Sequence, residues 1–81
     1  MRIPRDLSGA DLARRLGRLG YVATRQTGSH MRLTCPSPGE HHVTIPNHDP
    51  LRIGTLAATL DSVARHHGLS RDALLERLFS K

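Results

Sequence analysis

The chain has 81 residues, a length that allows one domain with a single modest core. Twelve Lys and Arg residues against 7 Asp and Glu give a formal charge of +5, which suits a polyanionic partner. A single cysteine excludes an internal disulfide, and no apolar run is typical of a secretory leader or a membrane span. We therefore expect one cytoplasmic domain over residues 1–81, without a membrane contact.

The first periodic segment predicts a helix from Gly9 to Leu19. Ser8 is its expected N-cap, because Asp11 follows at capping-box spacing, and Gly20 is its expected end. Three leucines recur at helical spacing and form its apolar face: Leu12, Leu16 and Leu19.

After this helix the apolar period changes to two, which predicts three strands at residues 21–26, 30–35 and 42–45. In the second strand the inward residues alternate with outward ones, and the inward set is Met31, Leu33 and Cys35. The outward set of the second and third strands is His30, Arg32, Thr34, His42 and Thr44. Gly28-Ser29 predicts a tight turn and residues 36–40 a short loop, so the strands form an antiparallel meander.

The last third of the chain predicts two helices. Leucines and small apolar residues recur at helical spacing from Ile53 to His67, and Gly68 follows as a stop. A short C-terminal helix follows the expected N-cap Ser70. We therefore predict an α+β fold of order α-β-β-β-α plus a C-terminal helix. Its three-stranded antiparallel sheet is covered by helices on one face, and the other face is open to solvent.

The outward residues of the predicted hairpin carry the most suggestive chemistry. His30 is expected to be exposed, and an imidazole can accept and return a proton. Arg25 and Arg32 lie close together in the hairpin and suit a phosphate group. This set is sufficient for metal-free RNA cleavage, in which the ribose 2′-hydroxyl attacks its own phosphodiester. The alternative from the pattern alone is a solvated histidine without a role.

The 6 histidines do not have the spacing of a metal site. His41-His42 and His66-His67 are adjacent pairs whose members point in different directions, and the only cysteine is expected in the core. We expect no metal and no cofactor, and expect His41, His66 and His67 at the surface. A DNA-reading helix-turn-helix at the C-terminal helices is less expected than a packed corner.

Several pieces of the chain, taken in order, resemble the HicA toxins of bacterial and archaeal toxin–antitoxin pairs. The matching pieces are Gly20-Tyr21, Arg25-Gln26, Gly28-Ser29-His30, Val43-Thr44-Ile45-Pro46 with His48, and Gly54-Thr55-Leu56. The resemblance implies a fold like the double-stranded-RNA-binding domain and the activity of an mRNA interferase. It also implies a HicB-type antitoxin that covers the active face. The DNA-binding part of this antitoxin is expected to bind the operator DNA of the pair.

The family's catalytic histidine carries over to His30 in the Gly-Ser-His turn. The expected substrate-binding residues are Arg25, Gly28, Ser29, Arg32, Thr44, His48 and Arg52. Thr27 and Ile53 stand where the family usually has Lys and Pro. The group that protonates the leaving oxygen is left open between His48, His42 and His30 itself. The alternative function is a non-catalytic RNA-binding module that uses the same open face.

Overall fold

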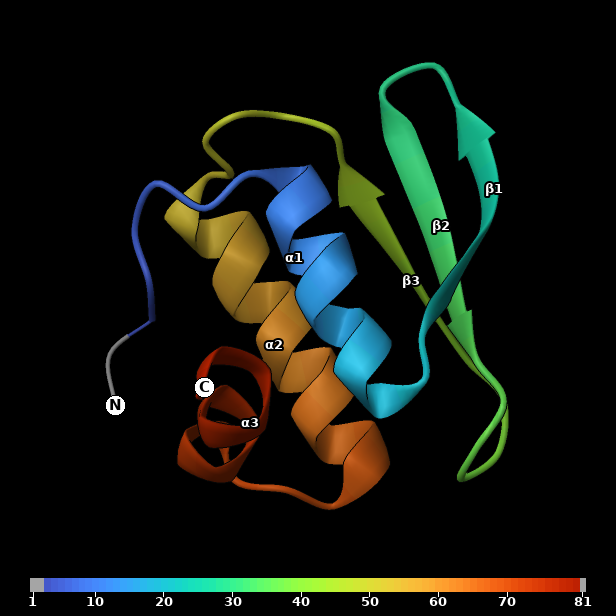
Figure 1. Ribbon diagram of the computed structural model, residues 1–81, viewed down its shortest axis with the longest axis vertical. Helices are drawn as coiled ribbons and strands as arrows, with labels where there is room; N and C mark the ends of the chain where they lie inside the picture. The colour runs from blue at the N-terminus through green and yellow to red at the C-terminus, as the bar shows by residue number, and fades with distance from the viewer. Residues whose placement is uncertain (1–2, 81) are drawn as a thin grey trace.

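The computed structural model describes residues 3–80 and has the predicted order of elements. These are α1 (Gly9–Leu16), the 3-10 turn η1 (Gly17–Leu19), β1 (Val22–Thr27), β2 (His30–Cys35), β3 (His41–Pro46), α2 (Ile53–His67) and α3 (Arg71–Phe79). The strands form one antiparallel sheet in the order β1-β2-β3. Helices α1 and α2 cover one face of the sheet, and α3 packs against the helical layer (Figure 1). The predicted α+β fold is confirmed.

The element bounds differ slightly from the sequence-based expectation. The first helix changes to a 3-10 turn at Gly17, a residue with low helical propensity, and Gly20 then reverses the chain with φ of 98°. Tyr21 is therefore a core residue, only 4% exposed, and β1 begins one residue after it. β3 is one residue longer at each end than predicted.

The alternation in β2 and β3 divides the two faces of the sheet as predicted. Leu33, Cys35, Val43 and Ile45 are buried against the helices, whereas the residues between them face solvent or are half-buried. The helices complete this aliphatic core with leucines, one valine and one alanine: Leu12, Leu16, Leu56, Leu60, Val63, Ala64, Leu74, Leu75 and Leu78. No helix within residues 3–80 has the length and apolar character needed to cross a membrane.

The helix caps that the sequence predicts are present. The Ser8 hydroxyl accepts a hydrogen bond from Asp11 N at 3.0 Å, and the Asp11 carboxylate accepts one from Ser8 N. Ser70 caps α3 in the same way, through Ala73 N at 3.1 Å. The N-terminal ends of α1 and α3 are therefore fixed by hydrogen bonds between residues that are close along the chain.

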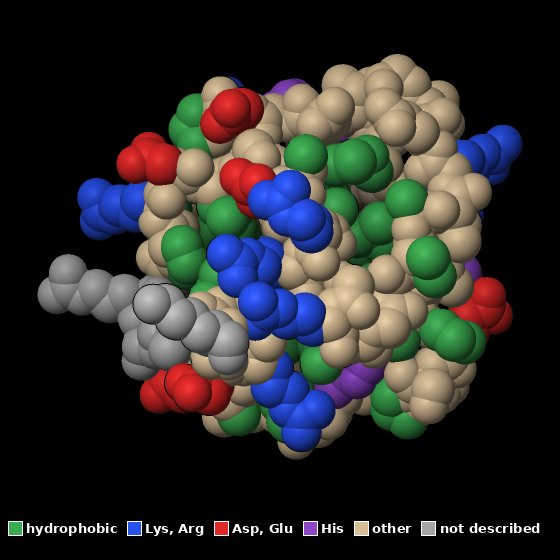
Figure 2. Space-filling view, in the orientation of Figure 1, with side chains coloured by type: hydrophobic (Ala, Val, Ile, Leu, Met, Phe, Trp, Pro, Cys, Tyr) green, Lys and Arg blue, Asp and Glu red, His purple; other side chains and the backbone are tan. Residues whose placement is uncertain are grey.

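Two arginines of the helical side attach α3 to the rest of the domain. Arg15 donates a hydrogen bond to the Leu78 carbonyl at 3.3 Å, and Arg18 donates to the carbonyls of Arg77 and Ser80. These carbonyls lie at the C-terminal end of α3, where cations stabilise the unpaired backbone acceptors. Figure 2 shows several arginines gathered on this side, so part of the positive charge has a structural role.

His41, His66 and His67, expected at the surface, are half-buried and contact one another and Tyr21, which the sequence did not indicate. The Tyr21 hydroxyl lies 2.6 Å from His41 Nδ1 and 3.1 Å from His67 Nε2, and the rings of His41 and His66 stack with centroids 4.4 Å apart. Since the hydroxyl has one proton, it donates to one imidazole and accepts from the other. This imidazole cluster (Tyr21, His41, His66 and His67) joins the start of β3 to the end of α2.

The imidazole cluster makes the stability of the domain depend on pH. Burial lowers the pKa of His41 and of His67 below the ordinary value of 6.5, and neighbouring His66 lowers both further. The unfolded chain therefore binds protons at higher pH than the folded one. The free energy of unfolding falls as pH drops below about 6.5, and levels off below the lowered pKa values.

We expect the melting temperature to be lower at pH about 5 than at pH about 7.5, because protonation of the cluster opposes folding. In His67→Gln this difference is expected to shrink, since one of the two affected imidazoles is gone. Differential scanning fluorimetry across this range measures both values. An equal drop in the wild type and the variant would contradict the assignment.

Candidate functional site

The open face of the sheet is the side that no helix covers. The register arranges its side chains in three cross-strand rows, because directly paired residues lie on the same face. The histidine row contains His30 with Thr27 and Pro46, the arginine row contains Arg25, Arg32 and Thr44, and the third row contains Val22, Thr34 and His42. The seven substrate-binding candidates and His30 are all exposed.

The arginine row places two like charges directly opposite each other. Arg25 and Arg32 are cross-strand partners, and a pair of like charges in this position destabilises a sheet. Neither guanidinium has an ion pair or a side-chain hydrogen bond with any other residue in the described part of the chain. The row therefore holds two uncompensated cations side by side, an arrangement that favours binding of an anion such as phosphate.

The hairpin between β1 and β2 presents His30. Thr27 pairs with His30, so Gly28 and Ser29 form a two-residue turn, and Gly28 has φ of 56°, which glycine adopts without strain. Met31 is half-buried against the core, which turns His30 to the opposite side. The imidazole therefore stands at the end of the open face, one row from the two guanidiniums.

Three backbone hydrogen bonds fix the loop after β3, one to this turn and two to the segment at the start of α1. Asn47 N donates to the Ser29 carbonyl at 2.6 Å, Gly9 N donates to the His48 carbonyl at 2.9 Å, and Leu51 N donates to the carbonyl of Leu7 at 2.8 Å. His48 is thus tied on one side to the turn that carries His30 and on the other to the start of α1. Arg52 follows this loop as the N-cap residue of α2.

Gly9 allows the close approach of α1 to this loop. A Cβ atom at this position would lie 2.1 Å from the Pro46 carbonyl oxygen, which no side chain tolerates without a backbone shift. The absence of a side chain at Gly9 therefore decides how near the His48 loop lies to the helical layer. The sequence offered no sign of this role, because the contact joins segments 37 residues apart along the chain.

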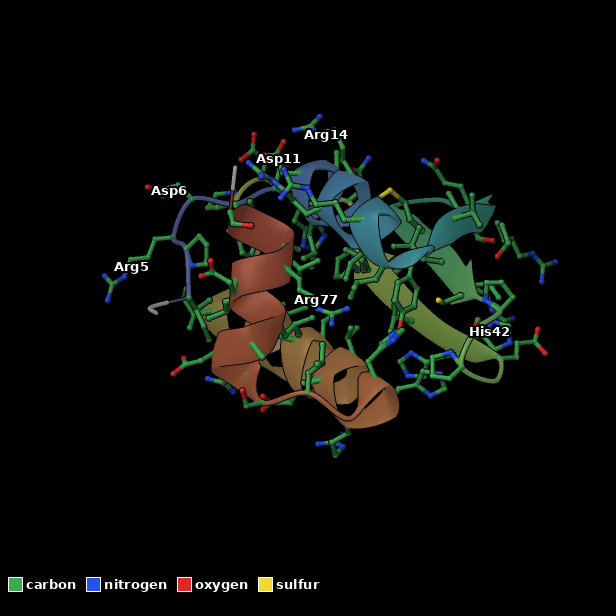
Figure 3. The ribbon with its side chains drawn as sticks, turned by 60° about the horizontal axis from the view of Figure 1, so that its bottom comes forward. Arg5, Asp6, Asp11, Arg14, His42 and Arg77 are labelled. Carbon is green, nitrogen blue, oxygen red and sulfur yellow. The ribbon has the colours of Figure 1, made fainter. Side chains whose placement is uncertain are left out.

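His42 and His48 were the other candidates for the group that protonates the leaving oxygen, and they lie at different ends of the open face. His42 pairs with Thr34, which lies four residues along β2 from His30, or about 13 Å at the rise of a strand. Figure 3 shows His42 next to the loop that joins β2 to β3, at the opposite end of the face from the Gly28-Ser29 turn. His48 lies at the same end as His30, and His42 does not.

Sequence reasoning missed a chain of polar contacts in the third row. The Thr34 hydroxyl lies 3.0 Å from the Thr24 hydroxyl and 2.8 Å from His42 Nδ1, and His42 Nε2 lies 3.2 Å from Glu40 Oε1. Thr24 reaches this row because the β1–β2 register shifts between Ala23 and Arg25. Such an irregularity leaves no period in the sequence. Within residues 3–80 no three His, Cys, Asp or Glu side chains are grouped to hold a metal ion.

Comparison with known proteins identifies the family of this chain. Residues 9–69 match the family model described as HicA toxin of bacterial toxin-antitoxin. Searches of curated proteins and of solved structures found no match. The matched region begins at Gly9 and includes the Gly28-Ser29 turn, all three strands, the His48 loop and α2. The family model thus spans every element that builds the open face, and the chain belongs to the HicA toxin family.

Proposed function

We propose that this toxin is a metal-independent endoribonuclease that cleaves mRNA and thereby arrests translation, with His30 as the general base. The observation that supports this most is the uncompensated pair of Arg25 and Arg32 in the cross-strand row next to that of His30. A fold gains no stability from two opposed guanidiniums, whereas a bound phosphodiester offsets their repulsion.

In the proposed reaction, His30 takes the proton of a ribose 2′-hydroxyl, whose oxygen attacks the adjacent phosphorus. Negative charge grows on the non-bridging oxygens, and the guanidiniums of Arg25 and Arg32 stabilise it there. The bond to the 5′-oxygen then breaks. The products are a 2′,3′-cyclic phosphate and a 5′-hydroxyl end. Because the nucleophile belongs to the RNA, the step needs no metal-activated water.

The leaving 5′-oxygen requires a proton, and we assign this proton to His48. The hydrogen bond between Asn47 N and the Ser29 carbonyl holds the His48 loop at the His30 end of the face, whereas His42 lies about 13 Å along the sheet. A pair of histidines, one neutral and one protonated, can perform the two proton transfers in one step.

The remaining candidates are proposed to bind the RNA backbone. The backbone N–H groups of Gly28 and Ser29 and the hydroxyl of Ser29 are available at the turn. Thr44 extends the arginine row toward β3, and Arg52 supplies a further charge where the His48 loop meets α2. These contacts position the strand without reading its sequence.

The proposed partner of the toxin is a HicB-type antitoxin that covers the open face. An antitoxin surface with carboxylates complements Arg25 and Arg32 and excludes RNA by competition. Under this proposal the toxin has no DNA contact of its own, and operator binding belongs to the antitoxin.

His30→Ala is expected to lower the rate of RNA cleavage by about 10²–10⁴-fold, because it removes the base while its exposed position leaves packing intact. Cleavage of a fluorescent RNA by the free toxin, with and without EDTA, measures this, and growth after induction measures toxicity. Undiminished cleavage by the variant rules out His30. Wild-type protein that binds RNA and never cuts it would instead support the non-catalytic RNA-binding module.

His48→Ala is expected to slow cleavage of ordinary RNA, because the 5′-oxygen then leaves without a proton. A substrate with sulfur in place of this oxygen needs no protonation, so it is expected to restore the rate of His48→Ala but not of His30→Ala. Single-turnover rates on the matched pair of substrates make the comparison. Equal defects of His48→Ala on both substrates would show that this histidine is not the acid.

Arg25→Gln is expected to weaken RNA binding and to reduce the salt dependence of binding by about one phosphate contact. The same change is expected to leave the free energy of unfolding unchanged or to raise it by about 0.2–1 kcal/mol, since the like-charge pair is relieved. Arg65→Gln, which removes an equal charge from an exposed position of α2, is the matched control. Equal losses of RNA affinity in both variants would mean that net charge alone drives binding.

A further inference from the structure

The third row of the open face holds an imidazole whose two nitrogens are both occupied. His42 Nδ1 contacts the Thr34 hydroxyl at 2.8 Å, and Nε2 contacts the Glu40 carboxylate at 3.2 Å. Each ring nitrogen therefore has a polar neighbour, whichever of the two carries the proton. The ring is therefore held at both polar edges, and 37% of the side-chain surface is exposed to a ligand.

Rings that bind single-stranded nucleic acid do so through their faces, on which bases stack. The chain has one tyrosine and one phenylalanine, and neither lies on the open face. Tyr21 is buried in the core, and Phe79 belongs to α3, with Arg15 over its ring at 5.4 Å. The rings that the described part of the open face can offer to a base are those of its histidines.

An exposed apolar side chain lies in the same row as this ring. Val22 is 61% exposed and pairs with Thr34, which pairs on its other side with His42. The row thus combines an aliphatic patch, a hydroxyl and an imidazole, next to the two cations of the arginine row. A base, which is flat and apolar on its faces and polar at its edges, complements such a row.

The position of the row along the sheet decides which part of the RNA it meets. It lies two rows and about 13 Å from His30, with the arginine row between them. If the scissile phosphate is bound at Arg25 and Arg32, a strand that continues along β2 places a flanking base over His42.

We propose that Val22, Thr34 and His42 form a base-stacking subsite for a nucleotide that flanks the scissile phosphate of single-stranded RNA. His42 supplies the ring, while Thr34 and Glu40 are positioning residues that hold it against the sheet. The subsite rests on the proposed RNA-cleaving function. It makes substrate affinity depend on RNA length, which a contact to the cleaved phosphate alone does not do.

The test compares three substitutions of His42 on a hexanucleotide RNA and on a dinucleotide that contains only the cleaved bond. His42→Ala removes the ring, His42→Gln keeps a hydrogen-bonding side chain without a ring, and His42→Phe keeps a ring without the hydrogen bonds. Loss of one stacked base corresponds to about 1–3 kcal/mol, so the KM for the hexanucleotide is expected to rise about 5- to 150-fold in the Ala and Gln variants. The Phe variant is expected to restore it, and dinucleotide cleavage is expected to stay at the wild-type rate.

Retained affinity in His42→Gln with loss in His42→Phe would overturn stacking in favour of a hydrogen-bonding role. Equal effects on the dinucleotide and the hexanucleotide would also overturn the subsite. If the wild type does not cleave RNA, hexanucleotide binding by the same variants in the His30→Ala background still decides the question, separately from the proposed function. Replacing one base at a time by an abasic site then identifies the stacked base, because its removal abolishes the effect of His42→Ala.

Discussion

The register of β2 against its two neighbours is the constraint on which the site depends. Side chains alternate with a period of two, so a slip by one residue would turn Leu33 and Cys35 to solvent and His30 and Arg32 into the core. Burial of the inward side chains forbids this slip, because each is worth about 1.5–3 kcal/mol. The two-residue turn and the contact between Asn47 and Ser29 fix the same register from the two neighbouring strands. The open face is thus held in position by the buried side chains on the other face of the sheet and by the turn and loop at its end.

The basic character of the chain divides into parts with different roles. Arg15 and Arg18 donate to the carbonyls at the end of α3, and Arg14 pairs with Asp11 within α1. These arginines hold the helical layer together or balance local charge. Arg25 and Arg32 have no such partner among residues 3–80. Net charge alone therefore says little about function in this domain, and the distribution of unpaired charge over its surface says much more.

The fold was predictable from the sequence wherever a local signal existed. The capping box at Ser8, the glycine stop at Gly20 and the alternation in β2 each appear in the structure, because each depends on residues close along the chain. The predicted turn at Gly28-Ser29 also placed Arg25 and Arg32 close together, and the structure pairs them. Contacts between distant segments were not predictable. The half-buried cluster around Tyr21, the close approach at Gly9 and the shifted register that brings Thr24 to Thr34 arise only from packing.

The open face has a consequence for how toxins of this design diversify. Its side chains are mostly exposed and contribute little to the core, so substitutions there change stability by about 1 kcal/mol or less. The residues that hold the face in place, such as Gly9 against Pro46, have almost no freedom to vary. The residues proposed to contact RNA and an antitoxin can therefore change while the scaffold stays fixed. Single substitutions on this face can therefore alter what the toxin binds without costing it its fold.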